Sequence, residues 1–241
     1  MFRLFPRNNK PAQDVHFVNI EVDIHAHWIP GVDDGSPAME LSLKMIRGLA
    51  GLGFKKLIAT PHIMHDHYEN HADKLKKAFQ SVVDAASKAG IEIDLGLGAE
   101  YMLDEGFMDH LNSRQILAIG DRYVLIEFPM NKPFPLAHRF IESILQAGYT
   151  PILAHPERYT YYRKDLETFL ELQEMGCHMQ LNLLSPTGYY GREVAVWSRQ
   201  LIERQMYHFA GSDIHHPSQL SQYSFDPSGI RFLNTQLLQP V

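Results

Sequence analysis

The stretch Val22-Asp23-Ile24-His25-Ala26-His27, followed by Gly31-Val32-Asp33-Asp34-Gly35, decides how the fold of this chain is interpreted. The residues before it, Phe17-Val18-Asn19-Ile20-Glu21, are mostly apolar and predict a strand. Where a strand ends its pleat loosens, so two imidazoles separated by one residue can face the same ion. Polar residues also occur at the ends of strands where no ion binds. The interpretation therefore depends on whether other ligands converge on this stretch.

The composition is that of an ordinary globular protein and narrows the classes of partner. The formal net charge of −6 argues against a nucleic-acid partner, because phosphate backbones require clustered cations. The single cysteine, Cys177, excludes a disulfide framework and fits a reducing compartment. No apolar run reaches the roughly 18 residues that are needed to span a bilayer. We therefore expect a cytoplasmic protein without membrane insertion, and the sequence leaves an oligomer open.

Strands and helices alternate along the chain, which predicts parallel strands joined by crossover helices. Residues 1–19 predict an irregular lead-in, and residues 20–241 predict a single α/β domain. About seven such units favour a closed barrel, although a doubly wound open sheet fits the same alternation. The expected strands are 17–22, 56–60, 91–97, 123–126, 150–154, 178–183 and 207–211; the expected helices are 37–51, 71–89, 136–147, 164–175 and 192–204, with short helices within 104–119 and 217–241.

Histidines and carboxylates follow the predicted strands one after another. In a barrel of parallel strands the C-terminal ends share one rim, so residues distant in sequence meet there. One catalytic ion uses about three protein ligands, so this set suits two or three ions with bridging carboxylates. A mixed nitrogen and oxygen set without thiolate favours Mn, Fe or Zn over Ca or Mg. The candidate metal ligands are His25, His27, Asp34, His62, Glu100, Glu127, His155, Asp213 and His215.

An arginine at the same rim indicates the class of reaction. Arg158 follows His155 by three residues, and a guanidinium there can bind a phosphate through two parallel hydrogen bonds. Paired ions generate hydroxide near neutral pH and hold the entering and leaving oxygens of a phosphate ester. We therefore expect hydrolysis of a phosphate ester by a metal-activated hydroxide. The alternative role for Arg158 is a salt bridge with Glu157 or Asp165.

These residues fall into a series of motifs that resembles the polymerase-and-histidinol-phosphatase (PHP) superfamily. The resemblance extends over about residues 20–217 and is strongest to the bacterial manganese-dependent protein-tyrosine phosphatases of capsule and exopolysaccharide synthesis. It implies a distorted (β/α)7 TIM-like barrel with a trinuclear metal site. The motifs are Asp23-x-His25-x-His27, Val32-Asp33-Asp34-Gly35, Thr60-Pro61-His62, Gly98-Ala99-Glu100, Ile126-Glu127-Phe128, Ala154-His155-Pro156-Glu157-Arg158-Tyr159 and Ser212-Asp213-x-His215.

The resemblance also implies roles for individual residues. Arg158 would be the catalytic, phosphate-binding arginine. Tyr159 is a substrate-binding candidate because of its place near the rim, and not because of the resemblance. The cofactor would be two to three divalent ions, with manganese first and iron or zinc next. The substrate would be phosphotyrosine on a protein, in the first place a bacterial tyrosine autokinase. One ion would take His25, His27, Glu100 and Asp213; a second would take Glu100, Glu127 and His155; a third would take Asp34, His62 and His215.

The sequence departs from the family pattern at one point and leaves alternatives open. Some members have another arginine shortly after Asp-x-His, where this chain has His216-Pro217-Ser218-Gln219-Leu220. Arg163 and Arg192 are possible replacements, and either also fits a solvated helix end. The other functions are a PHP-type phosphoesterase for a small ester such as histidinol phosphate, an amidohydrolase, and a non-catalytic module. A slot for the substrate ring would draw on Trp28, Tyr68, Phe128, Tyr159, Tyr161 and Tyr162, each of which also fits the core.

Overall fold

The computed structural model describes residues 19–163 and 165–238, so nearly all of the predicted lead-in lies outside the described residues. Its strands form two sheets, and every pair within them is parallel. The first sheet has the order β1 (Val22–Asp23), β2 (Lys56–Ala59) and β4 (Asp94–Leu97). The second has the order β3 (His62–Ile63), β5 (Glu100–Met102), β6 (Tyr123–Glu127), β7 (Thr150–Ala154), β8 (His178–Asn182) and β9 (Phe209–Gly211).

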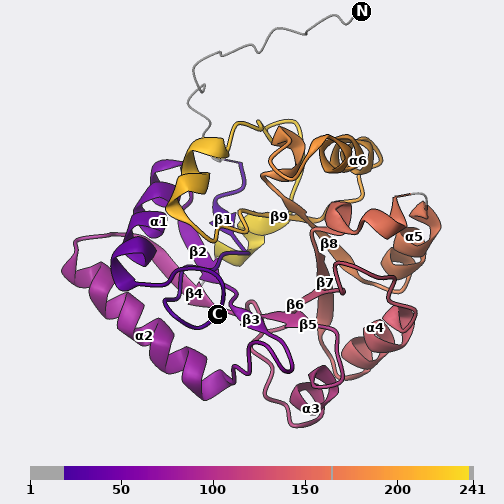
Figure 1. Ribbon diagram of the computed structural model, residues 1–241, viewed down its shortest axis with the longest axis horizontal. Helices are drawn as coiled ribbons and strands as arrows, with labels where there is room; N and C mark the ends of the chain where they lie inside the picture. The colour runs from indigo at the N-terminus through magenta and orange to yellow at the C-terminus, as the bar shows by residue number, and fades with distance from the viewer. Residues whose placement is uncertain (1–18, 164, 239–241) are drawn as a thin grey trace, which may run out of the picture.

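Backbone contacts join the two sheets into one ring of strands (Figure 1). Thr60 and Pro61 separate β2 from β3, and the Thr60 N–H donates to Ala26 O at 2.9 Å. On the other side Ala26 pairs in parallel with Ile214, which follows β9. The predicted α/β fold with parallel strands is thus confirmed. In the described part of the chain the strands form two linked sheets and not one continuous barrel sheet.

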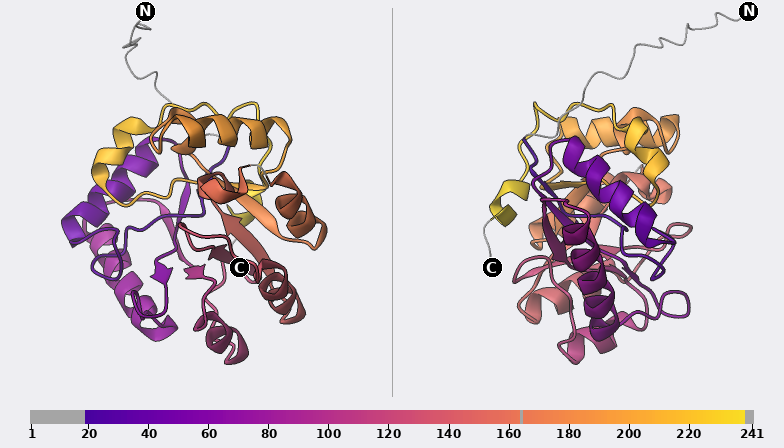
Figure 2. Two further views of the ribbon diagram at one scale, coloured as in Figure 1. Left: turned by 45° about the vertical axis from the view of Figure 1, so that its right-hand side comes forward. Right: turned by 90° about the vertical axis from the view of Figure 1, so that its left-hand side faces the viewer.

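In the described part of the chain, six α-helices lie around the outside of this ring (Figures 1 and 2). They are α1 (Met39–Gly51), α2 (Ala72–Lys88), α3 (Phe107–Asn112), α4 (Ala137–Gln146), α5 (Leu166–Glu174) and α6 (Arg192–Glu203). Short 3₁₀ helices follow the last strands: η1 (Pro156–Arg158), η2 (Thr160–Tyr162), η3 (Ser185–Thr187), η4 (Pro217–Gln222) and η5 (Asn234–Leu238). Within the described ranges no helix is both long and apolar enough to cross a membrane.

The element boundaries differ from the sequence predictions in informative places. The strand expected at 17–22 is reduced to Val22–Asp23 among the described residues. His62 and Glu100 begin short strands of their own, whereas the sequence placed them at the ends of longer ones. The final helix expected within 217–241 is a pair of 3₁₀ helices. The two breaks before β3 and β5 place His62 and Glu100 at the rim, where the other candidate ligands lie.

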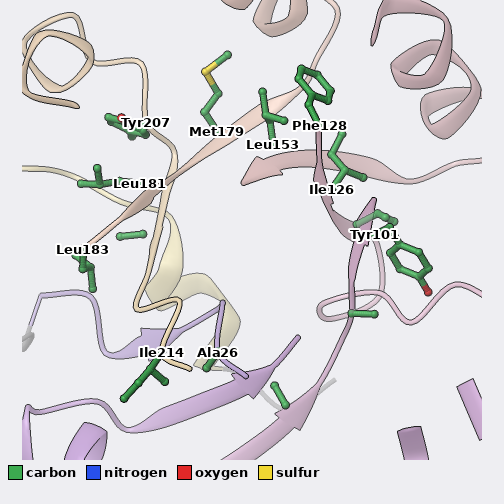
Figure 3. Packing of buried hydrophobic residues seen from close by; sticks show 14 of the residues in the cluster. Ala26, Tyr101, Ile126, Phe128, Leu153, Met179, Leu181, Leu183, Tyr207 and Ile214 are labelled. Carbon is green, nitrogen blue, oxygen red and sulfur yellow. The ribbon is translucent and has the colours of Figure 1, made fainter. Parts of the chain in front are cut away.

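Two hydrophobic clusters occupy the two faces of the strands. Leu153 of β7 belongs to the larger cluster, with residues of the surrounding helices, whereas Ile152 and Ala154 belong to the smaller one. Most residues of the smaller cluster come from strands, from positions beside them or from η5 and the residue before it; among the described residues, it includes none from α1 to α6. Strands buried on both faces are typical of parallel sheets covered by helices. Figure 3 shows the larger cluster, with Ile126, Leu153, Met179 and Leu181 projecting from neighbouring strands.

Candidate metal centre

The candidate ligands lie where the backbone leaves the strands under tight constraint. His155 directly follows β7, and Asp213 is the second residue after β9; their φ angles are positive, at 34° and 53°. Non-glycine residues reach this region at a cost of about 1–3 kcal/mol, and such residues cluster at functional sites. Gly35 has the opposite role, because a Cβ at this position would lie 2.1 Å from His27 O. The loop that carries Asp34 therefore needs glycine to approach the His-x-His stretch.

Four of the predicted ligands surround one point. His25 Nε2 lies 3.1 Å from His27 Nε2, 3.2 Å from Glu100 Oε2 and 3.3 Å from Asp213 Oδ1. His27 Nε2 lies 3.4 Å from the same Glu100 oxygen and 3.5 Å from the same Asp213 oxygen. Ligands about 2.0–2.1 Å from a tetrahedral ion are about 3.3–3.4 Å apart, so the spacing of His25, His27 and Asp213 fits one ion, with Glu100 beside the two histidines.

Two further groups adjoin this one. Asp34 Oδ1 lies 3.5 Å from both His62 Nε2 and His215 Nε2, which is the set expected for another ion. His155 Nε2 lies 3.1 Å from Glu100 Oε1, so Glu100 extends one oxygen to each of two groups. Glu127 differs from the expectation: its Oε1 lies 3.2 Å from His62 Nδ1 and shares a group with His62 and Glu100. All nine predicted ligands fall in such groups.

Several buried atoms of this cluster have no hydrogen-bond partner among the described residues. They include Glu100 Oε2, Glu127 Oε1 and His62 Nδ1. A buried polar group without a partner is costly, and a buried charge without one is more so. Carboxylate oxygens and imidazole nitrogens are also the donors that Mn, Fe and Zn accept. The residues present therefore fit divalent ions.

The electrostatics of the cluster point the same way. Burial alone would raise the pKa of Glu100, but His25 and His62 hold that pKa well below its usual range. Burial opposes protonation of His62, yet Glu100 and Glu127 raise its pKa to about 9. A hydrogen bond from His215 lowers the pKa of Asp34 to about 2. The ionised carboxylates thus favour protonated histidines beside them. Divalent ions bound to the cluster would supply this positive charge in place of the protons.

Three supporting side chains orient the ligands, and the sequence analysis gave none of them a role. Asp33 Oδ2 accepts a hydrogen bond of 2.8 Å from His27 Nδ1, and Gln180 Oε1 accepts one of 2.9 Å from His25 Nδ1. Each bond leaves Nε2 of the histidine facing the ion position, the usual arrangement around metal-binding histidines. Asn182 Nδ2 donates to Asp213 Oδ2 at 2.7 Å. Only the Asp33-Asp34-Gly35 motif carried a signal for any of the three.

Arg158 lies at the edge of the cluster. Its Nη1 donates to Asp213 Oδ2 at 2.9 Å, and its guanidinium carbon lies 4.4 Å from the centre of the Tyr190 ring. The alternative partner Glu157 is engaged elsewhere, since its carboxylate accepts from the Asn182 N–H and the Tyr207 hydroxyl. The second alternative partner, Asp165, caps α5 through Thr168.

The other substrate-binding candidates are distributed differently from the prediction. Tyr159 is fully buried, and its hydroxyl accepts the Phe128 N–H at 3.0 Å, so it does not face the cleft. Trp28 and Phe128 are also fully buried. Arg163 pairs with Glu193 and does not belong to the residues that line the cleft. The sequence analysis gave Tyr189 and Tyr190 no substrate role, and both face the cleft.

The cleft above the cluster has a volume of about 470 Å³. Polar ligands form its floor, and aromatic and methionine side chains form its walls. The lining residues are Asp34, His62, Met64, His67, Tyr68, Glu100, Met102, Glu127, Met130, His155, Arg158, Tyr189, Tyr190, Asp213, His215 and Gln219. Of the aromatic residues suggested for a substrate slot, Tyr68 alone belongs to this lining; its ring stacks on His62 with a 12° interplanar angle.

The sequence of this chain matches a known family model and is similar to characterised proteins. The family model for capsular polysaccharide synthesis, CpsB/CapC, matches residues 21–222. The chain is 31% identical over 195 residues to the tyrosine-protein phosphatase YwqE of Bacillus subtilis (strain 168), covering 80% of this chain and 77% of YwqE. It is 29% identical over 200 residues to the tyrosine-protein phosphatase CpsB of Streptococcus pneumoniae, covering 80% and 82%.

A solved structure extends the comparison to three dimensions. It comes from crystal structures of YwqE from Bacillus subtilis and CpsB from Streptococcus pneumoniae, described as unique metal-dependent tyrosine phosphatases. The TM-score is 0.78 at 28% sequence identity, and the match covers 89% of this chain and 90% of the other.

Proposed function

This chain belongs to the CpsB/CapC family of capsular polysaccharide synthesis proteins, and from that premise we propose that it is a metal-dependent protein-tyrosine phosphatase. One observation carries the proposal: Arg158 pairs with the carboxylate of Asp213, which is itself a member of the ligand cluster. A cluster suited to divalent ions beside a guanidinium suits a phosphate dianion better than a neutral amide. The relatives named above, which are tyrosine-protein phosphatases, support the same class of substrate.

The proposed cofactor is a set of two to three divalent ions, with manganese the first choice. His25, His27, Glu100 and Asp213 would hold one ion, and Asp34, His62 and His215 would hold another. Glu100, Glu127 and His155 would complete a third position. When bound, such ions activate water and neutralise phosphate charge.

The chain's own residues would prepare the phosphate for hydrolysis. Arg158 would bind the phosphate through guanidinium N–H groups other than the one that Asp213 holds. Asp33 and Gln180 would keep His27 and His25 in the tautomer that directs Nε2 to the cluster. The leaving phenolate has a pKa of about 10, so it requires less proton donation than an alkyl alcohol. We therefore expect no covalent enzyme intermediate and no strong dependence on a general acid.

The proposed substrate is phosphotyrosine on a protein, with a bacterial tyrosine autokinase as the first candidate. Such a kinase forms phosphotyrosine with ATP, so the reaction would take place in the cytoplasm. An open cleft with exposed aromatic walls is consistent with a side chain presented by another protein.

The test combines metal analysis with activity on a phosphotyrosine peptide. Protein purified without chelator is expected to carry at least two ions per chain and to release phosphate from the peptide, with manganese restoring chelated samples. Rates on histidinol phosphate, measured side by side, distinguish the small-ester alternative. Glu100→Gln serves as the loss-of-metal variant, because Glu100 approaches His25, His62 and His155. Fewer than two ions, together with no manganese-restored activity, would overturn the proposal.

A further inference from the structure

We propose that the segment 188–191 makes the cleft selective for aryl phosphates. In this proposal Tyr190 is a positioning residue for Arg158, and Tyr189 contacts the ring of the substrate. The inference rests on the proposed phosphatase function and names the part of the cleft that would recognise the aryl group. Both tyrosines line the cleft, and neither belongs to the metal-ligand set.

Tyr190 supports Arg158 from one face. The guanidinium carbon lies 4.4 Å from the centre of the Tyr190 ring, which is within the range of a favourable cation–π contact. The Nη1 N–H is held by Asp213 Oδ2, so the ring and the carboxylate together fix the plane and direction of the guanidinium. The N–H groups that Asp213 does not hold are then available to a phosphate in the cleft. Because the ring already restricts the guanidinium of Arg158, less conformational entropy is lost when a phosphate binds.

Tyr190 is itself fixed by the ligand cluster. Asn182 Nδ2 donates to the Tyr190 hydroxyl at 3.1 Å and to Asp213 Oδ2 at 2.7 Å. Asn182 ends β8, and its Oδ1 accepts the Leu184 N–H at 2.9 Å, which settles the orientation of the amide. Tyr190, Asn182, Asp213 and Arg158 therefore form a closed circuit of contacts. A position for the phosphate is linked in this way to a proposed metal ligand.

Tyr189 presents an exposed aromatic surface at the same place. Its side chain remains 47% exposed, and its ring meets the Tyr190 ring edge to face at 5.0 Å and 87°. Gly188 and Gly191 bracket the pair with φ angles of 91° and 96°, a region that glycine adopts without strain. The two glycines allow the chain to turn both tyrosines into one wall. A phosphotyrosine whose phosphate reaches Arg158 would bring its ring to this wall.

The experiment compares Tyr190→Leu, Tyr190→Phe and Tyr189→Leu with the unaltered, manganese-loaded protein. Tyr149→Leu is the matched control, because Tyr149 is partly buried and precedes β7 at the end of that strand remote from His155. Four quantities are measured for each protein: metal content, inhibition by inorganic phosphate, and kcat and KM on a phosphotyrosine peptide. Binding of inorganic phosphate and of free phosphotyrosine is also measured by calorimetry.

Each variant has a distinct expected outcome at unchanged metal content. Tyr190→Leu is expected to weaken phosphate inhibition about tenfold, whereas Tyr190→Phe, which keeps the ring face, retains most of it. Tyr189→Leu is expected to raise KM for the peptide about two- to tenfold while phosphate inhibition stays the same. Equal phosphate inhibition in Tyr190→Leu and the unaltered protein would overturn the positioning role. An unchanged KM in Tyr189→Leu would overturn the ring contact.

The outcome is separable from that of the proposed function. If the manganese-loaded protein does not hydrolyse the peptide, the phosphatase proposal fails. The calorimetric comparison still decides the inference in that case, because it requires no turnover. Loss of phosphate binding in Tyr190→Leu, and loss of the advantage of phosphotyrosine over phosphate in Tyr189→Leu, would support it. Absence of both losses would overturn it.

Discussion

Replacing Asp33 is expected to weaken metal binding without removing any of the nine proposed ligands. Its buried carboxylate accepts three hydrogen bonds: from His27 Nδ1 at 2.8 Å, from the His62 N–H at 3.1 Å and from the Gly35 N–H at 3.0 Å. Two of these donors belong to ligand residues, and the third belongs to the loop that carries Asp34. Asp33 therefore orients parts of two ligand groups at once.

The magnitude follows from the bond to His27. Loss of the partner that orients a metal-binding histidine costs about 10–100-fold in metal affinity, or about 1.4–2.7 kcal/mol. Asp33→Asn is expected to be at least as damaging as Asp33→Ala. An amide has one acceptor oxygen, so its NH₂ group must face at least one of the three donors. If it faces His27, the imidazole proton moves to Nε2 and blocks the nitrogen that faces the cluster.

The assay is a manganese titration of metal-free protein by calorimetry, with phosphatase activity followed at each metal concentration. Both Asp33 variants are expected to need about 10–100-fold more manganese for half-maximal activity. Asp94→Ala is the control, because Asp94 is exposed at the start of β4, away from the rim. Unchanged affinity in both Asp33 variants, with folding intact, would refute the orienting role. Restored affinity in Asp33→Asn alone would refute the tautomer argument.

Three other perturbations give separate tests. His27→Ala and Asp34→Ala are expected to empty different ion positions, so metal analysis should show a different partial loss in each; equal loss of every ion would contradict the assignment. Arg158→Lys is expected to lower kcat/KM about 10–100-fold at unchanged metal content, because an ammonium cannot reproduce the guanidinium's paired N–H groups. Burial and His208 lower the pKa of His178 to about 4, so stability is lost as pH falls from about 6.5 toward 4. In urea unfolding, the free energy of unfolding of His178→Phe should fall by about 1 kcal/mol less between pH 7 and pH 5 than that of the unaltered protein. This figure is discounted for solvent screening.

The strand-end pattern explains why the ligand cluster could be anticipated from the sequence. His155 and Asp213 follow compact apolar strands, and parallel strands direct such residues to one rim. The exact donor groups were less predictable. The assignment of Glu127 depends on the side-chain direction of His62, which uses Nδ1 toward Glu127 and Nε2 toward Asp34. Residue spacing contains no information about which imidazole nitrogen faces which carboxylate.

The residues that the sequence analysis missed have ordinary local contexts. Gln180 and Asn182 alternate with apolar residues in β8 and read as polar positions of a strand. Their roles appear only when β8 lies between β7 and β9, which brings Gln180 to His25 and Asn182 to Asp213. Tyr159 illustrates the converse: its position near the rim suggested the cleft, but it follows η1 and its ring is fully buried.

The opening His-x-His stretch is completed by residues from the other end of the domain. The Asp213 N–H donates to His25 O at 2.7 Å, and the His27 N–H donates to Ile214 O at 2.9 Å. Beside them Ser212 donates through N–H and Oγ–H to the Asp23 carboxylate at 2.8 Å and 2.6 Å. The contacts that close the ring of strands are thus made by the same segments that carry His25, His27 and Asp213. Any ion held by these three ligands would favour the closed ring over the open chain by mass action, so metal binding and ring closure would stabilise each other.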